Sequence, residues 1–126
     1  MSGLEHLRKS IVALRKRGGV AEAIIGIDQG IATIEGLRTA MKLFAPVYVF
    51  HDRGRRTYHP KLYVADAART ATVVLGSPNL TEGGLFRGYE TAVAIELDLS
   101  SDHDRSLFRD VSRYFGLLVK CGRPCQ

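Results

Sequence analysis

The stretch Thr57-Tyr58-His59-Pro60-Lys61-Leu62-Tyr63-Val64, followed by Gly76-Ser77-Pro78-Asn79-Leu80-Thr81, says most about the architecture of this chain. Residues 58–64 are rich in β-formers and predict a strand entered through a proline. Residues 71–75 predict the next strand, which runs directly into Gly76-Ser77. Because side chains two residues apart on a strand share a face, we expect His59 and Lys61 to point the same way.

Polar side chains at the ends of these two strands predict a common pocket. Gly76 permits a tight turn or a close backbone approach, and Ser77 and Asn79 follow it with a hydroxyl and an amide. If the two strands are neighbours, these groups converge with the imidazole of His59 and the ammonium of Lys61. Such a set suits a phosphate, because lysine supplies charge, Ser and Asn orient oxygens, and His can attack phosphorus or move a proton.

The order of these residues resembles the catalytic motif of the phospholipase D superfamily: His-x-Lys, Asp, an interval, and Gly-Ser with a nearby Asn. His59-Pro60-Lys61, Asp66 and residues 76–79 follow this order, and Glu90 resembles the acidic residue that follows the motif in bacterial nuclease members. Residues 47–97 are most similar to the domain of certain restriction endonucleases and helicase-linked members. The interval from Asp66 to Gly76 is longer than usual, which a longer hairpin would explain. We expect Asp66 to cap a turn rather than to act in catalysis.

The resemblance implies a phosphodiesterase that needs no metal ion or other cofactor. His59 would attack phosphorus and form a phosphohistidine, and a second histidine would protonate the leaving oxygen. Lys61, Ser77 and Asn79 would hold the non-bridging oxygens. Glu90 would hydrogen-bond the imidazole and fix its tautomer and orientation.

The motif occurs once in the chain, whereas superfamily members with two copies build one active site from both. The resemblance therefore implies a homodimer about a two-fold axis, with both His59 side chains meeting at the interface and with an inactive monomer. A second copy in a missing part of the protein is the alternative. The chain could be a fragment, since relatives of this type often carry a DNA-reading or motor domain after the nuclease domain.

Arginines near the motif are candidates for binding the substrate backbone. The net charge is +5, which suits a polyanionic partner. Several arginines and one histidine adjoin the motif and could contact flanking phosphates; a solvated loop or a plain turn is the alternative for each of them. These candidates are Arg53, Arg55, Arg56, Arg87 and His51.

The rest of the chain predicts alternating helices and strands in one domain over residues 1–126. We expect an α/β fold with a mixed β-sheet flanked by helices, which is the phospholipase D-like sandwich. The expected elements are a helix over 4–14 ended by Gly18-Gly19, a strand over 21–27, a turn at 28–30, a helix over 34–43 capped by Thr33, strands over 47–50 and 91–97, a helix over 102–119 with Leu107, Val111, Tyr114, Phe115 and Leu118 on its apolar side, and a loose tail over 121–126.

Composition narrows the class of protein. No apolar run approaches the roughly 20 residues of a membrane span, and the N-terminus lacks a secretory pattern. Cys121 and Cys125 lie too close to the C-terminus to staple the core, which favours reduced thiols in a cytoplasmic protein.

Three functions compete: a nuclease, with DNA favoured over RNA; a phospholipid-cleaving or phosphatidyl-transfer enzyme; and a non-catalytic nucleic-acid-binding or dimerisation module.

Overall fold

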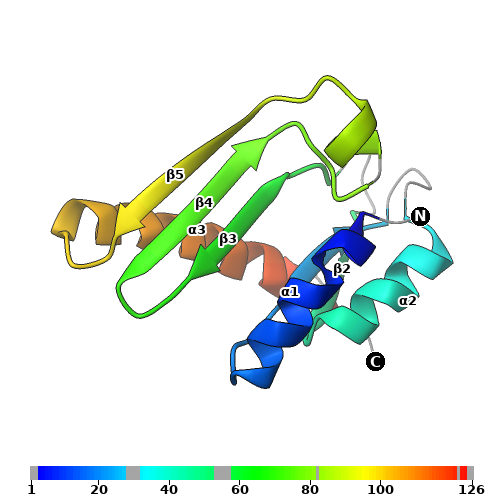
Figure 1. Cartoon of the computed structure of the whole chain (residues 1–126), viewed down its shortest axis with the longest axis horizontal. Helices are drawn as coiled ribbons and strands as arrows, with labels where there is room; N and C mark the ends of the chain where they lie inside the picture. The colour runs from blue at the N-terminus through cyan, green and yellow to red at the C-terminus, as the bar shows by residue number, and fades with distance from the viewer. Residues whose placement is uncertain (1–2, 28–31, 53–57, 82, 122, 125–126) are drawn as a thin grey trace.

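The protein has an α/β fold with two three-stranded sheets (Figure 1). The structure is a computed structural model and describes residues 3–27, 32–52, 58–81, 83–121 and 123–124. Its elements are α1 (Leu4–Lys16), β1 (Ala23–Gly26), α2 (Ile34–Leu43), β2 (Val47–Phe50), β3 (Leu62–Asp66), β4 (Thr70–Gly76), the π-helical turn η2 (Gly83–Arg87), β5 (Ala92–Asp98), α3 (Asp102–Cys121) and β6 (Arg123–Pro124). The single mixed sheet that we expected is therefore divided in two.

The first sheet has the order β1-β2-β6. β1 and β2 are parallel, so the chain needs a crossover between them, and α2 supplies it. β6 pairs antiparallel with β2, through Tyr48 with Pro124 and Val49 with Arg123. The prediction of a loose tail over 121–126 is wrong for the part that the structure describes, because Cys121 ends α3 and the next described residues belong to a sheet.

The second sheet is the antiparallel meander β3-β4-β5. The prediction that the two motif strands are neighbours in a sheet is confirmed, because Leu62 lies opposite Leu75 and Asp66 lies opposite Ala71. Only residues 67–69 join β3 to β4, and the N–H of Ala67 donates to the carbonyl of Thr70 at 2.8 Å. The long interval between Asp66 and Gly76 is thus strand β4 itself, and our explanation by a longer hairpin is wrong.

Helices α1 and α2 build the first core. The residues buried in it are Leu4, Ile11, Ala40, Leu43 and Val47. α1 ends as predicted, since Gly18 has a φ of 81° and the amides of Gly18 and Gly19 donate to the carbonyls of Arg15 and Leu14, each at 3.0 Å. The predicted cap of α2 is also confirmed, because Thr33 Oγ1 accepts the N–H of Gly36 at 3.1 Å.

Helix α3 covers the antiparallel sheet and also contacts β2 (Figure 1). It packs Phe108 and Val111 against the buried Ala71, Val73 and Leu97. Leu107, which we expected on the packed side, is 38% exposed. Both Leu107 and Phe108 fit the helical period with the apolar residues that follow, so the sheet decides which of them is covered. In the described part of the chain, no helix combines the length and the apolar character that crossing a bilayer requires.

Candidate active site

The His-x-Lys segment is irregular rather than extended as a strand. We predicted a strand from Tyr58, but β3 begins only at Leu62. Pro60 has no N–H to donate to a ladder, and the ring of Tyr58 stacks on Phe50, with 4.7 Å between ring centroids. The ring contact thus holds the segment that leads into β3 against β2 of the first sheet.

The side chains of His59 and Lys61 nevertheless meet. Lys61 Nζ lies 2.9 Å from His59 Nε2 and is also within hydrogen-bonding distance of Nδ1. His59 is exposed and Lys61 is half-buried. The contact places a positive charge directly beside a potential nucleophile, although it does not arise from the strand alternation that we used to predict it.

The end of β4 lies against the start of β3. The N–H of Gly76 donates to the carbonyl of Lys61 at 3.4 Å. A Cβ on Gly76 would lie 2.6 Å from Cα of Ala92, the residue opposite it on β5. The predicted close backbone approach at Gly76 is therefore confirmed, and it brings Ser77 to the same end of the sheet as Lys61.

Ser77 and Glu90 are hydrogen-bonded to each other. The Ser77 hydroxyl donates to Glu90 Oε2 and accepts the N–H of Thr91 at 3.1 Å. The N–H of Ser77 donates to the carbonyl of Thr91 at 2.9 Å. The resemblance implied that Glu90 contacts the imidazole of His59. In the structure the carboxylate bonds Ser77 instead, and the imidazole contacts Lys61.

The loop that carries Asn79 is tied to its surroundings through its backbone. The Tyr63 hydroxyl donates to the carbonyl of Pro78 at 2.7 Å. A Cβ on Gly84 would lie 2.6 Å from the carbonyl oxygen of Asn79, so the turn η2 packs tightly under the motif loop. The side chain of Asn79 is exposed, at the end of β4 where a substrate could reach it.

The motif loop also docks on the first half of the molecule, which the sequence did not predict. A Cβ on Gly3 would lie 2.7 Å from the carbonyl carbon of Leu80, and Leu80 packs against the core of α1 and α2. His6 on α1 contacts Phe86, with 4.5 Å between ring centroids. His6 is exposed, and its contact with Phe86 joins segments that lie far apart in the sequence, so it depends on tertiary packing.

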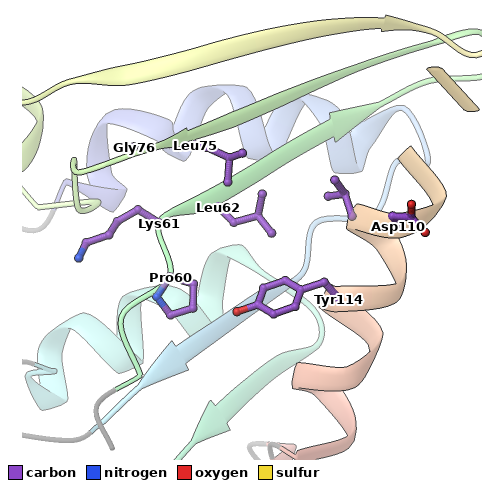
Figure 2. A pocket seen from close by; sticks show the side chains of 8 residues that line it. Pro60, Lys61, Leu62, Leu75, Gly76, Asp110 and Tyr114 are labelled. Atoms are coloured by element: carbon purple, nitrogen blue, oxygen red, sulfur yellow. The ribbon is translucent and has the colours of Figure 1, made fainter. Parts of the chain in front are cut away.

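A pocket of about 410 Å³ opens beside Lys61 (Figure 2). It lies between α3 and the place where β3 begins and β4 ends, away from the turn that joins these strands. Its lining residues are Pro60, Lys61, Leu62, Leu75, Gly76, Asp110, Val111 and Tyr114. Figure 2 shows the Lys61 side chain at one end and Asp110 at the other, with apolar side chains between them. The pocket therefore has an apolar body between a basic and an acidic end.

Two tyrosines beside these elements have raised pKa values. Burial raises the pKa of Tyr58 to about 12, and the nearby phenol of Tyr114 adds to the effect. Burial also raises the pKa of Tyr63. Both phenols are therefore neutral at physiological pH, and Tyr63 is available as the hydrogen-bond donor to Pro78.

The other predicted residues lie farther from this centre or outside the description. Asp66 is exposed and ends β3 next to the turn, at the opposite end of the strand from Lys61. His51 follows β2, and Arg87 ends η2; both side chains are exposed. Arg53, Arg55 and Arg56, and the turn at 28–30, lie outside the described residues.

Comparison with known proteins assigns no family. The sequence matches no model of a known protein family and no curated protein sequence. Within the described ranges, no three His, Cys, Asp or Glu side chains are grouped so that they could hold a metal ion.

Proposed function

We propose that this protein is a metal-independent phosphodiesterase that cleaves nucleic acid, with DNA favoured over RNA, through a phosphohistidine intermediate. The observation that carries the proposal is the contact between Lys61 Nζ and the imidazole of His59. An imidazole nitrogen that accepts from an ammonium holds a lone pair, as a nucleophile must. A substrate phosphate would draw the ammonium onto a non-bridging oxygen and free that lone pair for attack.

The proposed reaction has two displacement steps. In the first, a nitrogen of His59 forms a bond to phosphorus while the bond to the leaving oxygen breaks, and a second imidazole gives that oxygen its proton. In the second, water attacks the phosphohistidine, its proton returns to the second imidazole, and the N–P bond breaks. A second copy of the chain would supply that imidazole as its own His59, in a homodimer with a composite site.

Ser77 and Asn79 would orient the phosphate oxygens, and Glu90 would act through Ser77. The hydroxyl of Ser77 is held by Glu90 and by the N–H of Thr91. Its oxygen is thus fixed next to Gly76, whose backbone contacts Lys61. Glu90 is a positioning residue in this scheme, since its contact is with Ser77.

A polyanionic substrate agrees with the charge of the chain. The net charge is +5, and Arg87 lies between the motif loop and Glu90. Arg53, Arg55 and Arg56 directly precede the His-x-Lys segment in the sequence. Basic side chains around a phosphodiester site hold the flanking phosphates of a nucleic acid and fix its register.

The test is cleavage of plasmid and single-stranded DNA in excess EDTA by size-fractionated dimers. We expect the wild type to cut and the His59→Ala variant not to cut. The matched control is His103→Ala, because His103 is 88% exposed on α3 and its contact is with Asp104; this variant should cut like the wild type. No cutting by the wild type, or equal cutting by the His59→Ala variant, would refute the proposal.

A phospholipid substrate is the second candidate, and the pocket is the observation in its favour. Apolar side chains line its body beside Lys61. Leu75 is 44% exposed and Val93, its partner across the sheet, is 59% exposed, so an apolar surface adjoins the candidate site. Phosphatidylcholine vesicles in the same EDTA buffer test this alternative. Lipid cleavage that depends on His59, without DNA cleavage, would replace the nuclease proposal.

A further inference from the structure

Two aromatic side chains next to the candidate site face the solvent. Phe86 is 62% exposed, and Tyr89 is fully exposed. Arg87 lies between them, and Glu90, which bonds Ser77, follows Tyr89 directly. Large exposed aromatic rings are costly to leave in water and commonly mark a binding surface.

The backbone that presents these rings is closely hydrogen-bonded. The N–H groups of Gly84 and Leu85 donate to Oγ1 and to the carbonyl oxygen of Thr81, both at 3.0 Å. The N–H of Gly88 donates to the carbonyl of Gly83 at 2.8 Å. Phe86 is further held by the ring of His6. A ligand that stacks on the Phe86 ring, which is held in this way, loses little free energy to ordering it.

The chemistry of segment 86–89 favours a nucleic acid with exposed bases. Arg87 can contact a phosphate, while flat rings on either side of it can stack on bases. Duplex DNA hides the faces of its bases inside the helix, whereas a single strand exposes them. Paired aromatic and cationic side chains beside a phosphodiester site therefore distinguish unpaired from paired strands.

We infer that Phe86 and Tyr89 form a stacking platform for unpaired bases, which makes single-stranded nucleic acid the preferred substrate of the site. The inference rests on the proposed function, and it adds the substrate class. Phosphates reach His59 and Lys61 in any strand, but only unpaired bases can occupy the platform at the same time.

Binding by the non-cutting His59→Ala protein tests the platform separately from cleavage. The probes are a fluorescent single-stranded oligonucleotide, the same backbone with abasic sites throughout, and a duplex of equal length. We expect the single strand to bind at least about tenfold more tightly than the abasic strand, as one stacked base allows. When Tyr89→Ala is added to the His59→Ala protein, affinity for the single strand should fall about tenfold, and affinity for the abasic strand should not change. When Tyr89→Phe is added instead, affinity for the single strand should be retained.

Tyr89 is the primary position, because truncating a fully exposed ring cannot disturb the core. Phe86→Ala should give a similar loss, and Leu117→Ala, which removes an exposed side chain from α3, should give none. The inference is overturned if the abasic strand or the duplex binds as tightly as the single strand. It is also overturned if Tyr89→Ala leaves the affinity for the single strand unchanged. The same holds if Tyr89→Ala instead weakens dimerisation or the binding of phosphatidylglycerol vesicles.

The cleavage test keeps the two proposals apart. If the otherwise wild-type protein fails to cut DNA in EDTA, the proposed function fails, whatever the binding result. If it cuts but the Tyr89→Ala variant cuts single strands and duplexes with the same relative rates as the wild type, the platform fails and the nuclease stands.

Discussion

The hydroxyl of Ser77 is hydrogen-bonded to the carboxylate of Glu90 across the base of the loop that joins β4 to β5. The same hydroxyl accepts the N–H of Thr91 at 3.1 Å. These bonds hold together the two ends of the segment that contains the motif residue Asn79, the turn η2 and the two exposed aromatic rings. The geometry of the candidate site therefore depends on a contact between its own predicted residues.

Removing either partner of this pair should impair cleavage without unfolding the protein. For Ser77→Ala and Glu90→Ala we expect kcat/KM for DNA cleavage to fall by about 10- to 100-fold, because loss of an orienting partner misplaces the group that meets the phosphate. The double variant should be little worse than either single variant, since both remove the same contact. Additive losses would contradict a shared role. Glu96→Ala on β5, where Glu96 is exposed, is the matched control.

Tyr63 should matter for the position of the motif loop. Tyr63→Phe removes the O–H that donates to the carbonyl of Pro78 at 2.7 Å. We expect a loss of about 0.5–1.5 kcal/mol in the free energy of unfolding, together with a lower rate of DNA cleavage. Urea denaturation and cleavage kinetics measure the two effects. Tyr89→Phe, which alters a fully exposed ring, should change neither quantity. If Tyr63→Phe also leaves both unchanged, other contacts suffice to hold the loop.

Two glycine substitutions should act in opposite directions. Gly76→Ala places a Cβ 2.6 Å from Cα of Ala92, so it should force β4 and β5 apart and cost about 1–3 kcal/mol. Gly116 lies within α3, and a Cβ there meets nothing within 4 Å. Gly116→Ala should therefore stabilise the protein by about 0.5–1 kcal/mol. Thermal unfolding of both variants beside the wild type checks the contrast, and equal melting temperatures would contradict the close approach at Gly76.

Alkaline pH should destabilise the protein through Tyr58. Its pKa is raised to about 12 in the fold by burial, with a smaller effect of Tyr114, whereas an unfolded tyrosine titrates near pH ~10. Because the fold favours the neutral phenol, Tyr58 contributes stability that is complete below about pH 10. That contribution is lost as the pH rises toward 12. Urea denaturation at several alkaline pH values should show a decline that is shallower in the Tyr58→Phe variant. An equal decline in both proteins would contradict the raised pKa.

Local sequence signals predicted much of the architecture. The end of α1 at Gly18-Gly19 and the cap of α2 at Thr33 follow from backbone chemistry within one helical turn. The pairing of β3 with β4 follows from two apolar runs that a short turn connects. Each of these features depends on residues close together in the chain, and such residues interact whatever the rest of the molecule does.

Where the predictions failed, contacts between distant segments decided the outcome. Tyr58, where we expected a strand to begin, stacks on Phe50 of β2, and β3 begins only at Leu62. Phe108 rather than Leu107 faces the sheet, although both fit the helical period. In both cases several local arrangements have similar free energies, and the packing of a remote surface selects one of them.

The amino-acid sequence alone determined which chemical groups this protein can bring to a site: one imidazole, one ammonium, a hydroxyl, an amide and a carboxylate in a fixed order. Only the tertiary structure decided how they pair, with Lys61 on His59 and Glu90 on Ser77. The physical reason is that side-chain hydrogen bonds reach no farther than about 3 Å. Partners are therefore chosen by the folded backbone, whose course here depends on Pro60, Gly76 and the docking of the motif loop on α1.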